Sequence, residues 1–352
     1  MRNIEIVRKE LFDFLDLKNV KKIAIITDND EDGLTSALNG KLFFEKNCMK
    51  VQVFFYDHSN RNSENFVKPF TDFNPDKTIF FDLNENFVFD IIKDIDIVLK
   101  DFVVIDHHQG IELVNIQQKY LVIKPKDFSK IEPSKYPASK MVFDLFGGKE
   151  WFAAIGIIGD SSTEQWADFI EKVCKNISKK KLFEIADVCS CIVSMHEKKI
   201  SLLFDFLYNA EKPIDLLKSS FAELNNDFQN ILKSELNRAK KEGEFVEKID
   251  LIFFETKPRL PSKLSNLFSS KHKNKTIIFY SIENNFVKCS FRRQDFKVNC
   301  NVLANISLNG FENASGGGHI PASAARFPKK YLLEFKQNVI SYLEKNYVTK
   351  KV

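Results

Sequence analysis

The sequence predicts an α/β protein, in which a mainly parallel sheet with helices on both faces is followed by a connecting helix and a smaller α+β C-terminal domain. Two observations carry this prediction. Short apolar runs alternate with stretches of helical spacing early in the chain, and a long helical pattern precedes a second group of strands. With 352 residues the chain is long enough for two domains. We expect them at 1–220 and 246–352, joined by a helix at 221–245.

The first domain alternates strands and helices. Residues 23–26 are apolar and predict the first strand, and residues 33–46 have the spacing of a helix. Three more strands are expected at apolar runs that end in polar residues, namely 51–57, 77–84 and 102–108. Residues 86–95 predict a helix between the last two. Strands that are apolar on both faces indicate a parallel sheet covered by helices.

The second domain is expected to begin after the connecting helix, where apolar residues recur at helical spacing from Leu224 to Ala239. The elements expected beyond it are a strand, a helix, a hairpin and a closing helix, at 248–256, 261–270, 275–293 and 329–346. Asn284 and Asn285 are the turn of the hairpin, because Asn tolerates the backbone of a tight turn. These elements make an α+β domain.

Charge divides the chain in the same way. Residues 246–352 carry 18 Lys and Arg against 8 Asp and Glu, a net charge of +10, whereas the whole chain has a net charge of only +4. The preceding part is therefore acidic. A basic module is typical of polyanion binding, and an acidic module requires cations.

Composition also suggests the compartment. The charged start of the chain is unlike a secretion signal. The longest apolar run, 151–159, is too short to span a bilayer, so we expect no membrane partner. None of the six Cys forms a CxxC pair, which favours reduced thiols in a cytoplasmic protein.

Acidic and imidazole side chains follow several of the predicted strands. The residues are Asp28, Asp30, Asp32, Asp82, Asp106, His107 and His108, and Asp57 and His58 also follow a strand. Carboxyl ends of parallel strands meet at one edge of a sheet, so these groups converge. Each Asp alone could be a helix cap or a turn residue. Together, oxygen ligands with one or two imidazoles suit Mn²⁺ or Mg²⁺ and predict a divalent metal site. A preceding strand, and Asn39 where an EF-hand needs Glu, exclude a calcium loop.

Five motifs in order resemble those of the DHH phosphoesterase superfamily. They are "DNDEDG" at 28–33, Asp82 in "FFDLN", "IDHH" at 105–108, Asp160 in "AIGIIGD", and "SGGGH" at 315–319. The last, with Ser290 and Arg292 in "CSFRR", is similar to the DHH-associated C-terminal domain. The D-x-D-x-D-G form resembles RecJ-like exonucleases of the compact archaeal type. One departure is Ile320, since the family often reads GGGHP.

The resemblance implies a role for each matched residue. It implies two Mn²⁺ or Mg²⁺ ions and six metal ligands, which are Asp28, Asp30, Asp32, Asp82, His107 and Asp160, with Asp82 bridging the ions. Asp106 would orient an imidazole, and His108 would contact the scissile phosphate or assist the leaving oxygen. Asp160 also has a simpler interpretation, because residues 151–160 could be a buried helix that ends in a polar residue.

In the C-terminal domain the resemblance implies substrate binding. The residues are Ser290, Arg292, Gly316, Gly317, Gly318 and His319. Consecutive glycines open backbone N–H groups to a phosphate, although such a run can also be a flexible turn. Arg293 and the charge of +10 strengthen the interpretation. Five lysines are interpreted as steering charges or solvated surface, namely Lys271, Lys273, Lys275, Lys350 and Lys351.

Three functions fit these features. The first is a two-metal, RecJ-like exonuclease that degrades single-stranded DNA or RNA to mononucleotides. The second is a phosphodiesterase for very short oligonucleotides or cyclic dinucleotides, of the nanornase kind. The third is a replisome scaffold, but such scaffolds lose metal ligands and this chain retains them. A GINS-type or other replisome partner is compatible with catalysis.

Overall fold

The computed structural model describes residues 2–56, 64–94, 99–108, 110 and 119–348. The chain forms two compact units, Met1–Asn225 and Asn226–Val352. The boundary falls within α10, Ser220–Glu242, at the place of the predicted connecting helix. No helix of the described part is long and apolar enough to cross a membrane. Asp57, His58, Lys350 and Lys351 lie outside the described residues.

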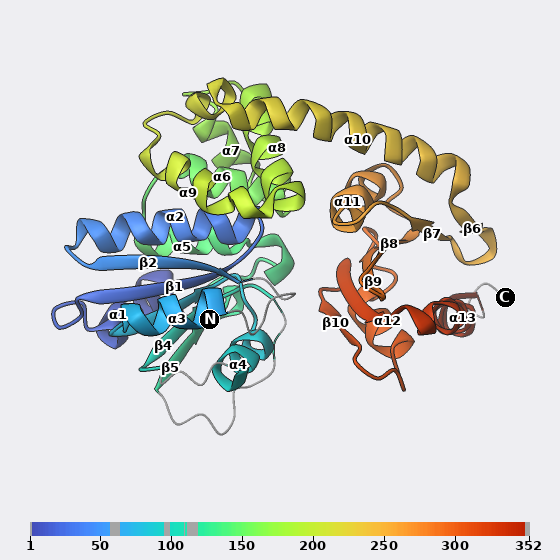
Figure 1. Ribbon diagram of the computed structural model, residues 1–352, viewed down its shortest axis with the longest axis horizontal. Helices are drawn as coiled ribbons and strands as arrows, with labels where there is room; N and C mark the ends of the chain where they lie inside the picture. The colour runs from blue at the N-terminus through green and yellow to red at the C-terminus, as the bar shows by residue number, and fades with distance from the viewer. Residues whose placement is uncertain (1, 57–63, 95–98, 109, 111–118, 349–352) are drawn as a thin grey trace. The chain divides into compact units, whose positions relative to one another are not determined.

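The first unit is built on a five-stranded sheet in the order β2-β1-β3-β4-β5, with every neighbouring pair parallel (Figure 1). The strands are β1 Lys22–Asp28, β2 Lys50–Tyr56, β3 Lys77–Phe81, β4 Phe102–Ile105 and β5 Tyr120–Ile123. The sequence predicts the first four. It does not single out β5, whose apolar run is only four residues long.

Helices cover both faces of this sheet. They are α1 Ile4–Leu15, α2 Glu31–Lys46, α3 Glu64–Phe73, α4 Glu85–Asp94, α5 Ala138–Phe146, α6 Glu150–Gly159, α7 Ala167–Val173, α8 Lys179–Met195 and α9 Ile200–Asn209. Alternate residues of β1 point to opposite faces. Ile23 and Ile25 pack in a core with α2, α5 and α6, whereas Ala24 and Ile26 pack in another with α3 and α4. Figure 1 shows α2 and α5 on the face away from α4. The predicted fold class is confirmed.

The second unit has a mixed six-stranded sheet in the order β10-β11-β9-β8-β7-β6. Its strands are β6 Glu244–Val246, β7 Leu251–Glu255, β8 Thr276–Glu283, β9 Phe286–Arg292, β10 Ser315–Gly318 and β11 Ala322–Pro328. Only β7 and β8 run parallel. The predicted hairpin is β8–β9. Its turn residues, Asn284 and Asn285, have φ of 47° and 66°, as a tight hairpin turn requires.

Besides the end of α10, further helices of the described chain pack on this second sheet. They are α11 Pro261–Lys271, α12 Cys300–Ser307 and α13 Leu332–Leu343. On one face Phe335 of α13 meets Phe291 of β9, with 5.9 Å between ring centroids. Phe268 of α11 contacts Phe279 of β8 at 5.3 Å. The helices expected at 261–270 and 329–346 are therefore present, the second as a shorter α-helix flanked by other helical turns.

Candidate metal centre

A row of ionisable residues lies at one edge of the parallel sheet. The last residues paired across β1, β3, β4 and β5 are Thr27, Phe81, Ile105 and Ile123. The residues that follow them are Asp28, Asp82, Asp106 and Lys124. Because the strands are parallel and in register, these four positions are neighbours at the carboxyl edge, as the sequence predicts for the three Asp.

Asp82 has the least compensated carboxylate of this row. The residue is 2% exposed and adopts φ 57°, and its backbone N–H donates to the Ile105 carbonyl at 3.1 Å. Neither carboxylate oxygen has a hydrogen-bond partner in the described part of the chain. Burial, and then the charges of Asp32 and Asp30, raise the pKa of Asp82 well above its ordinary value. A buried carboxylate without donors is what a bound cation would stabilise.

The start of α2 adds the next carboxylates. Asp30 caps the helix and accepts a hydrogen bond from Gly33 N at 2.9 Å. Asp32 is buried in the first turn and accepts from the backbone N–H groups of Ala138 and Ser139, at 2.7 and 3.0 Å. These two groups begin α5, whose positive dipole end favours an anion. Burial raises the pKa of Asp32, and that of Asp30 rises to about 8 through burial and the charge of Asp28.

His107 presents a neutral imidazole to these carboxylates. Its Nδ1 lies 3.2 Å from the Pro133 carbonyl, which can only accept, so Nδ1 carries the proton. Nε2 therefore directs its lone pair to the side of Asp82 Oδ1, at 3.4 Å, and Asp32 Oδ2, at 3.9 Å. Burial lowers the pKa of His107 to about 3. This tautomer is the one that a metal ligand needs.

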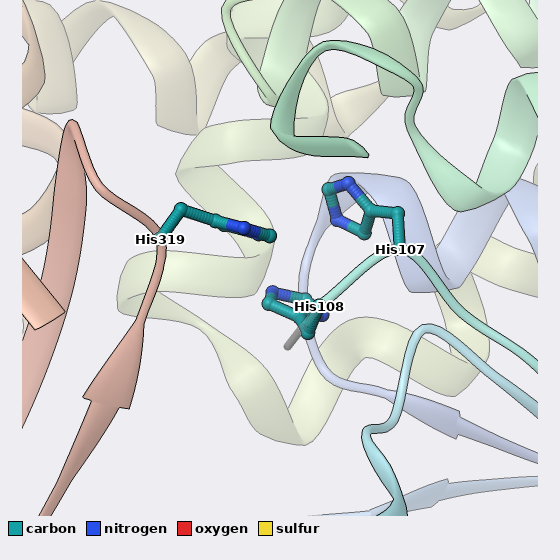
Figure 2. A group of neighbouring side chains, drawn as sticks. All are labelled: His107, His108 and His319. Atoms are coloured by element: carbon teal, nitrogen blue, oxygen red, sulfur yellow. The ribbon is translucent and has the colours of Figure 1, made fainter. Parts of the chain in front are cut away.

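His108, unlike the neutral His107, carries a protonated imidazole. Its ring is edge-on to that of His107, with 4.4 Å between centroids, and both imidazoles follow β4 (Figure 2). Its Nδ1 lies 2.8 Å from Asp106 Oδ1, and its backbone N–H donates to Asp106 Oδ2 at 3.0 Å. Burial lowers the pKa of His108, but Asp106 outweighs this effect and raises it to about 9. His108 is therefore an imidazolium with a partly exposed side chain.

Lys124 is a site residue that the sequence analysis missed. It is buried, and its Nζ donates to Asp106 Oδ2, to Glu85 Oε2 at 2.8 Å and to the His108 carbonyl at 2.8 Å. Burial opposes ionisation of Asp106, yet His108 and Lys124 hold its pKa well below the ordinary value. The available signal was its place directly after a short apolar run, at the same sheet edge as the Asp residues.

Two compact groups of possible metal ligands form here, and they share Asp82. One is Asp32, Asp82 and His107; the other is Asp82, Asp106 and His108, each with ligand atoms within 4.8 Å of one another. The donor set of carboxylates and imidazole suits Mn²⁺ or Mg²⁺. Of the two groups, Asp32, Asp82 and His107 fit a divalent cation, whereas His108 is held by Asp106 through Nδ1 and is not a ligand in this protonated form. The bridging role implied for Asp82 stays a prediction.

Asp28, Asp30 and Asp160 belong to neither group. Asp160 follows α6, and its Oδ2 lies 3.9 Å from His107 Nδ1, on the ring side that faces Pro133. Burial and the charge of Asp32 raise the pKa of Asp160 well above its ordinary value, so it is part of the acidic cluster. Metal ligation by these three residues stays a prediction.

The glycine run of the second unit is a strand rather than a loop. Gly316, Gly317 and Gly318 form most of β10, an edge strand paired with β11. The strand leads to a tight turn in which His319 N donates to the Ala322 carbonyl at 2.6 Å; Figure 2 labels His319 on this segment. The additional Ile320 fits this turn, because its carbonyl accepts from Cys300 N at 2.8 Å.

Around the Ser-x-Arg motif of β9, Arg293 is buried although it was expected to support phosphate binding. Ser290 is buried on β9, and its Oγ lies 2.9 Å from Ser265 Oγ of α11. Arg292 is half-buried and donates to Ser262 Oγ at 3.2 Å. Arg293, which we expected to support phosphate binding, is instead buried in a two-bond pair with Asp295. Substrate binding by Ser290, Arg292, the glycines and His319 stays a prediction.

Comparison with known proteins identifies a domain within the first unit. Residues 22–170 match the model of the DHH family, N-terminal domain. The first unit carries a DHH domain. The match includes the acidic turn, Asp82, "IDHH" and Asp160. No curated protein matches the sequence significantly.

Solved structures share the fold beyond the DHH domain. RecJ from Thermus thermophilus in complex with Mn²⁺ is 14% identical with a TM-score of 0.68, covering 97% of this chain and 55% of that one. The chain thus spans about half the length of that RecJ. An exonuclease RecJ bound to manganese is 14% identical with a TM-score of 0.65, covering 100% and 97%. An exopolyphosphatase-related protein from Bacteroides fragilis is 16% identical with a TM-score of 0.55, covering 97% of both chains.

Proposed function

We propose that the chain is a metal-dependent phosphodiesterase of the RecJ type, which hydrolyses single-stranded DNA or RNA from an end to nucleoside monophosphates. The observation that carries the proposal is the buried carboxylate of Asp82, which lacks hydrogen-bond donors in the described chain and lies within ligand distance of Asp32 and the neutral His107. Support comes from the DHH family match and from the fold shared with RecJ structures that contain Mn²⁺.

The first unit would hold the metal. Asp32, Asp82 and His107 would hold a divalent cation, Mn²⁺ or Mg²⁺. When bound, two such cations activate water and offset the charge of the phosphoryl group. The chain's own contribution is orientation: the N–H groups of Ala138 and Ser139 fix Asp32, and the Pro133 carbonyl fixes His107.

His108 would supply the proton donor. Asp106 holds Nδ1 of its ring, which leaves Nε2–H directed away from that carboxylate and able to donate to a phosphate oxygen or to the departing oxygen. Lys124 contacts both Asp106 and the His108 carbonyl, so it keeps this pair in place. In the second unit we assign Arg292 and His319 to the substrate phosphates.

The test is a degradation time course on end-labelled single strands of DNA and RNA, with Mn²⁺, Mg²⁺ or EDTA. We expect turnover only with a metal. Asp82→Asn and His107→Ala should each lower kcat by about three orders of magnitude, the scale of losing a charge-stabilising group. Full activity in EDTA, or in the Asp82→Asn protein, would exclude this metal centre.

The dependence of kcat/KM on substrate length distinguishes the exonuclease from an enzyme that acts on very short oligonucleotides. A binding module that neutralises several phosphates gains affinity with each one, so kcat/KM should rise with length from two to twenty nucleotides at fixed salt. A maximum at two to four nucleotides, with longer strands uncut, would identify the nanornase alternative instead.

A further inference from the structure

An exposed phenylalanine stands out on the second unit. Phe296 lies in the segment between β9 and α12, and its side chain is among the exposed large apolar ones at 42%. Its backbone has φ 60°, in the left-handed region that aromatic residues rarely adopt. Strained backbone of this kind persists where the surrounding structure enforces it, often at binding sites.

The segment around Phe296 is held rigidly. Arg293 is buried and donates through Nε and Nη2 to the two carboxylate oxygens of Asp295, at 2.7 and 3.0 Å. Asp295 Oδ1 also accepts from Lys297 N at 3.1 Å. Gln294 Nε2 donates to Ser269 Oγ of α11 at 3.2 Å. The turn that carries the Phe296 ring is thus ordered before any ligand binds. Binding to the ring would therefore cost little conformational entropy of the protein.

Lysines surround this turn. Asp295 N donates to the Lys273 carbonyl at 3.1 Å, which brings residues 271–275, the "KHKNK" stretch, beside the turn. Lys271, Lys273 and Lys297 are exposed. The pKa of His272 is lowered by burial and then by the charges of Lys275, Lys240 and Lys271. The surface therefore combines an apolar ring with cationic groups.

The same end of the second sheet carries the predicted phosphate-binding residues. Arg292 pairs in register with Ile277, near the start of β8, and with Ala322, at the start of β11. Arg293 N donates to the Pro321 carbonyl at 2.9 Å, so the turn after His319 is attached to the Phe296 segment. Within the second unit, the segment that carries Phe296 thus lies at the same end of the sheet as Arg292 and the turn after His319.

We propose that Phe296 is a base-stacking residue for single-stranded nucleic acid, with Lys271, Lys273 and Lys297 contacting the flanking phosphates. This inference rests on the proposed function and names a residue that would contact the bases of its substrate. Lysines attract any polyanion, including polyphosphate, but an exposed ring adds affinity only for a planar base. Stacking on an aromatic ring tolerates every base and is lost on substitution by alanine.

The experiment uses the full chain in EDTA, which prevents hydrolysis. Fluorescence anisotropy measures affinity for a labelled twelve-nucleotide oligothymidylate and for an abasic strand of equal length. Phe296→Ala should weaken binding of oligothymidylate by about tenfold or more. It should leave binding of the abasic strand unchanged, because the phosphates are the same. Phe296→Trp should bind oligothymidylate at least as tightly as the wild type, since it retains the stacking surface.

The matched control is Phe245→Ala, because Phe245 of β6 has a similar exposure of 43%. This control should leave the affinities for oligothymidylate and for the abasic strand unchanged.

Circular dichroism checks that each variant is folded. If Phe296→Ala unfolds, Phe296→Trp tests the proposal instead, because the fluorescence of its added indole should change when oligothymidylate binds. An unaltered signal there, or equal losses on both strands in Phe296→Ala, would overturn the stacking role alone. A wild-type protein that neither binds nor, with Mn²⁺, cleaves oligothymidylate or oligouridylate would overturn the proposed function as well.

Discussion

In the metal-free site, the carboxylate of Asp82 is in an electrostatically unfavourable environment. Its carboxylate is buried, lacks donors in the described chain, and lies among Asp32, Asp30 and His107. Its φ of 57° is one that Asp and Asn tolerate better than most residues. A carboxylate in this position lowers the stability of the metal-free protein and gains most when a cation binds.

Asp82→Asn should therefore separate the two effects. Asn fits the same backbone and removes the charge, so the metal-free Tm should equal or exceed that of the wild type. Mn²⁺ at one hundred times its Kd should stabilise the wild type by about 2.7 kcal/mol and this variant far less. Thermal melts with EDTA or Mn²⁺ measure both. An equal Mn²⁺ shift in the two proteins would show that Asp82 is not a ligand.

Lys124 compensates the other buried acids. It contacts Asp106 and Glu85, which are both buried. Lys124→Met removes the cation that pairs with Glu85 and one of the two that pair with Asp106, which should cost about 3–5 kcal/mol in the free energy of unfolding. Urea unfolding measures this loss. Lys68→Met is the control, because Lys68 pairs with Asp72 in full exposure and should change stability by less than about 1 kcal/mol. Similar losses in the two variants would contradict this assignment.

At the scale of elements, the close approach of α2 to β1 positions the acidic turn. Gly33 lies in the first turn of α2, where an added Cβ would come within 2.4 Å of the Asp28 carbonyl oxygen. Thr27 Oγ1 donates to the Gly33 carbonyl at 2.8 Å, which fastens the helix to the strand. The glycine is thus required by contact with backbone, which cannot rotate away.

Gly33→Ala should therefore destabilise the protein, although Ala for Gly inside a helix is ordinarily worth about 1 kcal/mol of stabilisation. Displacement of α2 would also move Asp30 and Asp32, so Mn²⁺ affinity measured by calorimetry should fall. Gly317→Ala is the comparison, because nothing lies within 4 Å of its added Cβ in the described part of the chain. A Gly33→Ala protein as stable as the wild type would show that the packing can relax.

For the whole molecule, the division of charge has a direct consequence. Residues 246–352 carry a net charge of +10, and the exposed lysines around Phe296 belong to them. If this module neutralises about six phosphates, affinity for a long single strand should fall by about 300-fold between 50 and 200 mM salt. Anisotropy titrations at several salt concentrations measure the slope, and Arg292→Ala should make it shallower. A flat response would exclude phosphate contacts as the source of affinity.

The sequence by itself determined the strands and the charges at their ends. Apolar runs predict β1 to β4, and parallel pairing places their carboxyl ends at one edge of the sheet, so Asp28, Asp82 and Asp106 were expected at that edge. The strand order that brings β1, β3 and β4 side by side came from the tertiary structure. Only the tertiary structure decided which groups meet across long separations. Lys124 donates to Glu85 and Asp106, and Asp32 accepts hydrogen bonds from the start of α5. Arg293 is buried and pairs with Asp295, and the glycines of β10 pair with β11 as a strand. The periodicity of apolar residues predicts the face of a helix or strand on which a residue lies. The residue that it contacts depends on how whole helices and strands pack together, and this packing is determined by the entire chain.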